Sequence, residues 1–246
     1  MPFLLDDHFD RGTSNFFADY NAWEPWNVDY KLVQWMTPYW QHSKPPLTLR
    51  LPERGPEMMP GITGFVSCQN LMDREGGFLV VVDFIPRQAG ITGEHFGVFL
   101  RVHNSDSPHH SERIGVAIQS SRNPSGQCEG AEAFLQLTGR LKDRTKIEYG
   151  HRFVCFKLKE DVFASGLNHR HRVEFEERPE EEGVSWEARI YRYGFWGWSL
   201  RGCEAVSEEE LDIYTPSLPA GVAVALGPGF GARVDVDSIR VERLDQ

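Results

Sequence analysis

Helical periodicity is almost absent from this chain of 246 residues, and no apolar run approaches the ~20 residues that a membrane-spanning helix needs. Basic charge is also scarce, because the formal net charge is -10 and the pI is about 5.4. Binding to nucleic acid needs a basic footprint that displaces counterions from phosphates. These absences predict an all-β protein with no nucleic-acid partner and no membrane partner.

The four cysteines are far apart and lack the CxxC spacing of a zinc site. We therefore expect reduced thiols, with Cys155 as a small core residue in the apolar run RFVCFKL. The opening MPFLLDDHFDRG also lacks the basic, apolar and small-residue segments of a secretory signal. The sequence as written predicts a cytoplasmic protein, and a secreted one is expected if a signal has been removed.

The chain consists instead of short alternating or fully apolar runs between clusters of Gly, Pro, Asn and Asp, which is typical of a β-sandwich or barrel. Hydrophobic residues make up 40% of the sequence, enough for a sizeable core, so we expect a single β-sandwich domain over residues 1–246. Residues 1–60 alternate weakly and are rich in aromatic residues, which predicts an extended segment packing on the sandwich. The expected strands are Phe78–Pro86, His95–His103, Ile114–Ser120, Ala133–Thr138, Arg152–Lys159, His171–Glu177, Val184–Tyr193, Trp196–Leu200, Val222–Leu226 and Arg233–Arg243.

The last expected strand, ARVDVDSIRVER, changes parity in its middle. Its two valines before Asp237 share one face of a regular strand, whereas Ile239 and Val241 share the other. A β-bulge near Asp237 and Ser238 brings all four apolar residues to one side, and bulges are typical of curved sheets. The sequence therefore predicts a curved sheet with a concave side.

Two acidic segments are predicted to be structural elements and not parts of a functional site. The run EFEERPEEEG, which contains Glu174, Glu176 and Glu177, is expected to be a solvated hairpin tip. Ser207 precedes three consecutive glutamates, a pattern that predicts a capped helical turn over Glu208–Ile213.

Three segments of the sequence resemble the concanavalin A-like superfamily of jelly-roll domains. LLDDHFDRG is similar to the opening strand, LNHRHRVEFEERPEEEGVSWEARIYRYG to a common hairpin, and GVAVALGPGFGARVDVDSIRVERL to the terminal pair of strands in laminin G-like, lectin-like and glucanase-like members. The resemblance implies an all-β jelly-roll sandwich of two curved antiparallel sheets, whose concave face binds carbohydrate in many members. It does not by itself imply catalysis.

The run HFGVFLRVH places unusual residues on the face opposite its apolar one. That face carries His95, Gly97, Phe99, Arg101 and His103. The following run IGVAIQS adds small residues opposite its own apolar set, with Gln119 at the rim. We expect this combination on the concave sheet, where Gly115 and Ala117 leave room for a ligand.

The acidic Glu-x-Asp-x-x-Glu motif that retaining glucanases of this fold carry is absent, which disfavours hydrolysis. Elimination across a uronic acid needs a group that neutralises the carboxylate, a base and an acid. The polar residues supply candidates: Arg101 as neutraliser, His103 or His95 as base, Tyr191 as acid and Gln119 as orienter. If the protein is an enzyme, a polysaccharide lyase is therefore favoured over a glycoside hydrolase.

Aromatic rings stack on sugar rings and guanidinium groups pair with carboxylates, so further residues suit an acidic glycan. The candidate substrate-binding residues are Phe99, Arg189, Tyr193, Trp196 and Trp198. Relatives of the fold bind calcium at the convex edge, and the resemblance places Asp7, Asp235 and Asp237 as ligands of a structural calcium ion.

Each of these residues also has a structural interpretation. Phe99 can belong to a covered core, Arg101 can pair with an acidic neighbour, and exposed strand-end histidines often have no role. The chain can thus be a carbohydrate-active protein that binds an oligo- or polysaccharide, a non-catalytic lectin-like module, or an intracellular protein whose groove holds a small apolar molecule or a protein partner.

Overall fold

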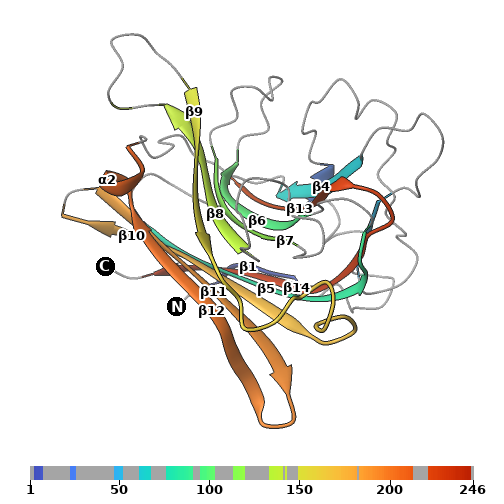
Figure 1. The fold of residues 1–246 in the computed structure, drawn as a ribbon. Helices are drawn as coiled ribbons and strands as arrows, with labels where there is room; N and C mark the ends of the chain where they lie inside the picture. Colours follow the sequence, from blue (N-terminus) through green and yellow to red (C-terminus); the bar gives the residue numbers. More distant parts are fainter. Residues whose placement is uncertain are drawn as a thin grey trace.

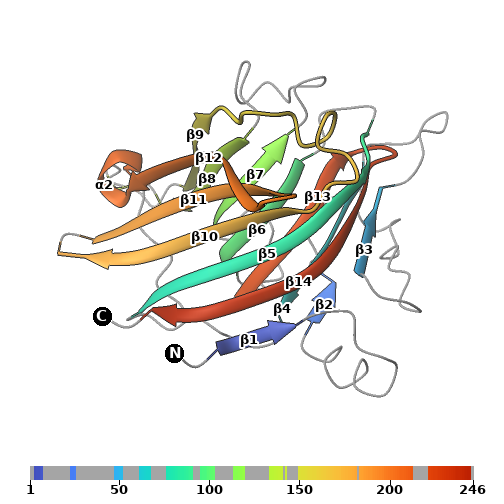
Figure 2. The same cartoon turned by 90° about the horizontal axis from the view of Figure 1, so that it is seen from below.

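A computed structural model describes residues 3–7, 23–25, 47–51, 61–67, 76–90, 95–102, 113–119, 133–140, 142, 149–181, 183–212 and 221–244. Within them the chain forms two seven-stranded antiparallel sheets that pack face to face, and one short helix (Figures 1 and 2). No helix of the described part is long and apolar enough to cross a membrane.

The two sheets interleave segments from distant parts of the sequence. Sheet A contains, in spatial order, β1 (Phe3–Asp7), β14 (Arg233–Leu244), β5 (Gly77–Gln88), β10 (His171–Glu180), β11 (Gly183–Gly194) and β12 (Gly197–Ser207), with β3 (Leu47–Arg50) also paired to β14. Sheet B contains β2 (Trp23–Pro25), β4 (Gly61–Ser67), β13 (Gly221–Gly229), β6 (His95–Val102), β7 (Arg113–Gln119), β8 (Ala133–Arg140) and β9 (Tyr149–Phe156). Helix α2 (Glu208–Leu211) follows β12.

The architecture confirms the expected all-β sandwich of two antiparallel sheets. The apolar run that forms β5 lies inside sheet A, between β14 and β10. The expected bulge is present, because the register of β14 against β5 shifts between Val236 and Ser238. Ser207 caps α2 with a capping box in which its hydroxyl accepts from the Glu210 backbone N–H. Most strand boundaries differ from the prediction by a few residues; β12, for example, runs from Gly197 to Ser207, and Trp196 lies in the preceding turn.

The core lies between the sheets. Every second residue of β5 and β6 points inward, and the rings of Phe84 and Phe96 stack across the interface with centroids 4.2 Å apart. Neighbouring inward positions on the other strands, such as Val173, Ile190 and Val224, are also fully buried. Strand parity therefore sorts the remaining side chains onto two outer faces.

Arg101 departs from the parity expected for β6. It has a φ of 58°, and the register of β6 against β13 shifts at the same place. This irregularity turns Val102 onto the outer face, where it packs with Phe99. The Arg101 side chain points inward and is 3% exposed. The expectation that Arg101 lies on the ligand-facing side is wrong, because a bulge reverses the alternation before the strand ends.

The inward Arg101 forms an ion pair that crosses from one sheet to the other. Its Nη2 donates to Oε1 of Glu177 on β10 at 2.6 Å, and Trp186 Nε1 donates to Oε2 of the same carboxylate at 3.0 Å. The guanidinium carbon also lies 5.4 Å from the centre of the Phe78 ring. A buried carboxylate is tolerated because these donors replace water.

The acidic run of β10 is therefore not a solvated tip along its whole length. Glu177 is 1% exposed and Glu176 is 3% exposed. Glu176 faces the opposite side of the strand and pairs with Arg178 and Arg189. Only the end of the hairpin, at Glu180, is exposed as expected. The prediction was wrong for the two buried glutamates because their partners come from other strands.

The cysteines also differ from the prediction. Cys155 is exposed on β9 and is disulfide-bonded, so it is neither a core residue nor a reduced thiol. Cys203 is free and exposed. Alternation explains the exposure, because Val154 and Phe156 take the inward positions of β9 and leave Cys155 on the outer face.

Removing the positive partner of the crossing ion pair should destabilise the protein strongly. An Arg101→Met substitution leaves the Glu177 carboxylate buried beside Trp186 alone, which should lower the free energy of unfolding by about 3–5 kcal/mol. The double variant Arg101→Met with Glu177→Gln removes the unpaired charge and should recover most of that loss. Urea unfolding of both variants measures this; an Arg101→Met variant as stable as the wild type contradicts it.

Candidate functional site

The outer face of sheet B, which points away from sheet A, has a floor of small residues. One row runs across four neighbouring strands through Gly64, Ala225, Gly97 and Ala117, which are aligned in register. The row ends at Phe134 on β8. Because these side chains are small, they project little from the sheet. The larger Phe134 ring projects further at the end of the row.

Phe99 occupies the space that two of the glycines leave. A Cβ atom on Gly115 would lie 2.3 Å from Phe99 Cδ1, and one on Gly97 would lie 2.5 Å from Phe99 Cε2. The ring of Phe99 therefore lies flat over both glycines, and Phe99 is 8% exposed. The glycine at position 115 was expected to leave room for a ligand. That expectation is wrong, because the room is filled by a side chain of the same sheet.

His95 lies at one end of this face as a buried, neutral imidazole. Its side chain is hydrogen-bonded to Gln119, the residue aligned with it on β7, and its ring meets Phe134 edge-on at 5.1 Å. Burial lowers the pKa of His95 to about 4, although the Gln119 hydrogen bond opposes the shift. Nε2 is buried and has no hydrogen-bond partner among the described residues, an uncommon state for a buried polar atom.

The rings continue from His95 toward the edge of the sheet. Phe134 meets Phe153 of β9 edge-on at 5.6 Å, and Phe153 stacks with His151 at 6.5 Å. His151 Nδ1 shares a 2.9 Å hydrogen bond with the hydroxyl of Thr138. Phe153 is 36% exposed and His151 is also exposed. The face thus passes from a covered centre to an accessible edge at β9.

The outer-face residues of β8 and β9 were not among the predicted site residues. The runs AFLQLTGR and YGHRFVCF both alternate, and their polar and aromatic positions fall on the outer face of sheet B. These are Phe134, Gln136, Thr138, His151 and Phe153. The alternation of apolar and other residues in the two runs indicates from sequence alone which residues share a strand face, and so could have identified this set.

The other predicted site residues do not join this face. Tyr191 and Arg189 lie on β11, whose partners are β10 and β12 of sheet A. Their side chains share the outer face of sheet A with Glu174, on the far side of the sandwich from His95. Arg101 lies between the sheets, as described above. His103 lies outside the described residues. Among the described candidates, the acid Tyr191, the base His95 and the neutraliser Arg101 are therefore not assembled around one substrate position.

Arg189 and Tyr191 are engaged by carboxylates on sheet A. Arg189 contacts Glu174 at 3.3 Å, Glu176 at 2.6 Å and Glu187 at 3.2 Å. Burial and the nearby Glu174 carboxylate raise the pKa of Tyr191. The guanidinium of Arg189, predicted to bind a substrate carboxylate, is thus engaged by three carboxylates of the protein itself.

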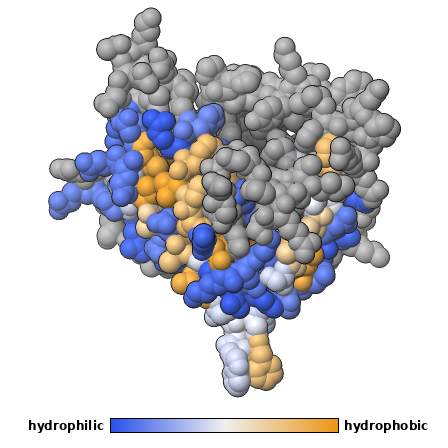
Figure 3. All heavy atoms as spheres, viewed as in Figure 1, coloured by the Kyte–Doolittle hydropathy of each residue, from blue (hydrophilic) through white to orange (hydrophobic). Residues whose placement is uncertain are grey.

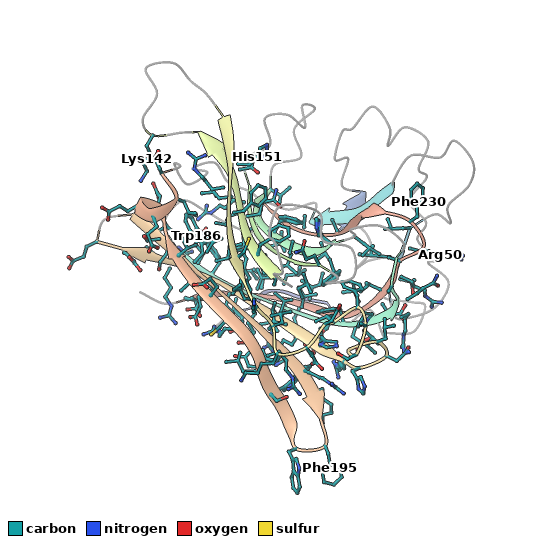
Figure 4. All side chains as sticks on the ribbon, viewed as in Figure 1. Arg50, Lys142, His151, Trp186, Phe195 and Phe230 are labelled. Carbon is teal, nitrogen blue, oxygen red and sulfur yellow. The ribbon has the colours of Figure 1, made fainter. Side chains whose placement is uncertain are left out.

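The remaining predicted aromatic residues lie on the β11–β12 hairpin. Tyr193 is 51% exposed and meets Trp198 edge-on at 5.2 Å. Trp196 is 94% exposed in the hairpin turn. In Figure 4, His151 is labelled at the upper part of β9, whereas Phe195 is labelled at the lower end of the molecule. Phe195 contacts Trp196 edge-on. The hairpin aromatics and the outer face of sheet B therefore belong to different surfaces.

Two of the three expected calcium ligands, Asp235 and Asp237, form ion pairs with arginines. Asp235 accepts from Arg87 at 2.6 Å and from Thr48 at 2.7 Å. Asp237 contacts Arg170 at 3.3 Å, and burial raises the pKa of its carboxyl. Asp7 lies on β1 opposite Ile239, but its side chain lies outside the described part. Among the residues with described side chains, no three His, Cys, Asp or Glu converge on a metal position.

A separate hollow of about 300 Å³ opens on the outer face of sheet A beside α2. Its lining includes Glu176, Arg178, Trp186 and Glu210. Several charged groups within it already have partners, since Arg178 pairs with Glu176, Glu187 pairs with Arg189 and Glu210 is bonded to Ser207.

Comparisons with known proteins establish the fold class. No protein-family model matches the sequence, and no curated protein sequence matches it. Among solved structures, the carbohydrate recognition domain of Emp46p in its metal-free form has a TM-score of 0.57 at 9% identity, over 97% of this chain and 94% of that one. A legume lectin-like domain from Entamoeba histolytica has a TM-score of 0.54 at 10% identity, over 98% of both chains.

An endo-acting O-glycanase from members of the human gut microbiota has a TM-score of 0.54 at 13% identity, over 99% of this chain and 100% of that one. A potassium-bound form of the Emp46p domain matches with a TM-score of 0.50 at 6% identity, over 97% of this chain and 95% of that one. The fold is thus a concanavalin A-like jelly roll, as the sequence resemblance implied.

The depressed pKa of His95 should make the protein less stable in mild acid. The unfolded chain takes up a proton at this residue near pH 6.5, whereas the folded chain does not until about pH 4. The free energy of unfolding should therefore fall across that window by on the order of 3 kcal/mol from His95 alone. Urea unfolding at pH 7 and pH 4 of the wild type and of His95→Asn measures the difference, and equal losses in both proteins contradict it.

Proposed function

We propose that the outer face of sheet B binds a neutral oligo- or polysaccharide. The observation that carries this proposal is the pair of accessible, stacked rings of Phe153 and His151, which is backed by the buried rings of Phe134 and His95. Rings of this kind cover the apolar faces of sugars, and a few fixed polar groups beside them orient hydroxyls. The lectin and glycanase domains that share the fold support the assignment to carbohydrate.

The side chains described on this face support a neutral sugar, because none of them is Asp, Glu, Lys or Arg. The accessible polar groups are the Gln136 amide and the His151 imidazole, whereas Gln119, Thr138 and His95 are buried behind them. A uronic acid needs a guanidinium or another donor of positive charge, and Arg101, which was expected to supply it, is buried against Glu177.

The separation of His95 from Tyr191 supports binding over elimination. A lyase needs its base and its acid at the same sugar ring, within hydrogen-bond reach of the reacting atoms. His95 and Tyr191 belong to different sheets and face opposite sides of the sandwich. The proposed protein is therefore a lectin-like module, which was the second interpretation of the sequence.

We further propose that the protein works in an oxidising compartment, such as the cell exterior, where glycans are present. The disulfide at Cys155 supports this, because glutathione and thioredoxin keep most cytosolic thiols reduced. Since that bond consumes two of the four cysteines, thiol titration of the denatured, unreduced protein should find two free thiols. Four free thiols in protein prepared under oxidising conditions would contradict this proposal.

A glycan array followed by calorimetric titration of the best neutral ligand tests the binding proposal. Phe153→Ala removes an exposed ring of the proposed surface and should weaken binding roughly tenfold, which corresponds to about 1.4 kcal/mol. Tyr193→Ala is the matched control, because it removes an exposed ring from sheet A and should leave the affinity unchanged.

Three outcomes contradict the proposal. One is binding that Tyr193→Ala weakens and Phe153→Ala does not. Another is selective binding of uronate polymers with growth of absorbance near ~235 nm, the sign of an elimination reaction. The third is the absence of any glycan ligand together with binding of a small apolar molecule or a protein.

A further inference from the structure

The hairpin of β11 and β12 presents two large aromatic side chains at its tip. Gly194 pairs with Gly197, which leaves Phe195 and Trp196 as the turn. Phe195 is 91% exposed and Trp196 is 94% exposed. The hairpin projects beyond the rest of the sandwich in Figure 1, and Figure 4 labels Phe195 at its end. Figure 3 shows the same end standing clear of the surrounding surface.

The turn itself does not require these residues. A short hairpin turn needs backbone freedom, which Gly197 provides with a φ of 97°. Phe195 and Trp196 contact each other edge-on at 4.9 Å, so they form one apolar tip rather than two isolated side chains. Tyr193 and Leu200 extend the tip along both strands, at 51% and 39% exposure. A contiguous exposed apolar surface of this kind usually marks an interaction site.

The sequence of the hairpin around the tip contains only basic charges, in contrast to the acidic chain as a whole. From Ala188 to Cys203 the sequence contains three arginines and no carboxylate, although the net charge of the protein is -10. Of these arginines, Arg192 and Arg201 flank the tip and share the single carboxylate of Glu160.

A second pair of arginines lies behind the first. Arg170 and Arg172 both bind Asp83, with Asp237 as a further partner of Arg170. Both guanidinium groups also lie over the ring of Trp198, at 5.8 Å and 4.3 Å. The apolar tip is therefore backed by arginines, two of which contact the aromatic base of the hairpin.

We propose that this hairpin tip docks the protein on an anionic lipid surface. Phe195 and Trp196 enter the boundary between headgroups and acyl chains, where aromatic rings are favoured. Arg192 and Arg201 then lie at the level of the phosphates and gain from the negative surface potential. The sequence predicted no membrane partner because it lacks a spanning stretch, but surface docking of a hairpin requires none.

Lipid is favoured over a protein as the occupant. A stable protein–protein interface buries about 800 Å² on each partner, more than two side chains at a narrow tip can supply. A lipid surface needs no matching pocket and is complementary to an apolar tip with arginines behind it. Docking here also leaves the outer face of sheet B free, because the tip belongs to sheet A.

Flotation with vesicles tests the proposal, using phosphatidylcholine alone and phosphatidylcholine with roughly a third phosphatidylserine. The wild type should bind the anionic vesicles, less at high salt, and should bind the neutral vesicles weakly. Phe195→Ser with Trp196→Ser should lower the partition coefficient by roughly 100-fold or more. Arg192→Gln and Arg201→Gln should each lower it roughly fivefold.

Phe153→Ala is the matched control, since it removes an exposed ring from sheet B and should leave vesicle binding unchanged. The tip residues are outside the core, so the melting temperature of the double serine variant should match that of the wild type. The proposal is overturned if the wild type does not bind anionic vesicles, or if the double variant binds them equally well. It is also overturned if the tip substitutions abolish binding to a glycan or a protein and leave vesicle binding intact.

Discussion

The packing of sheet A on sheet B determines which side chains can act together. Once alternate residues of β5, β6 and β11 are buried between the sheets, each remaining side chain has one of two outer faces available. His95 lies on the outer face of sheet B and Tyr191 on the outer face of sheet A, so they cannot form a common site. The buried pair of Arg101 and Glu177 joins the two layers and removes from the outer surface the one arginine of β6.

Local patterns predicted the elements well. The apolar run of β5 marked an inner strand, the parity change near Ser238 marked a bulge, and Ser207 marked a helix cap. Each of these features depends on residues that are close in the sequence. The alternation of β8 and β9 carried similar information about Phe153 and His151, although the sequence analysis did not use it to assign a site.

Other features depend on contacts that the sequence does not display. The inward turn of Arg101 is set by the register of β6 against β13, a strand more than a hundred residues further along the chain. Glu177 is buried because Arg101 and Trp186 supply donors from two other strands. The assignment of β6 and β11 to different sheets is likewise a matter of topology, and composition cannot reveal it.

The resulting molecule has two surfaces of different character. The outer face of sheet B combines rings, amides and hydroxyls around a floor of small residues, which suits a neutral sugar. The β11–β12 hairpin combines a bare aromatic tip with arginines, which suits a charged interface. Because they occupy different sheets, a ligand on one leaves the other accessible.

Chemical-shift mapping with a neutral oligosaccharide tests the central claim most directly. Titration of isotope-labelled protein should move the backbone amide signals of β8 and β9 and the ring signals of His151. The signals of β10, β11 and β12 should stay in place. Shifts confined to sheet A, with none on β8 and β9, would contradict the assignment of the sugar site to sheet B.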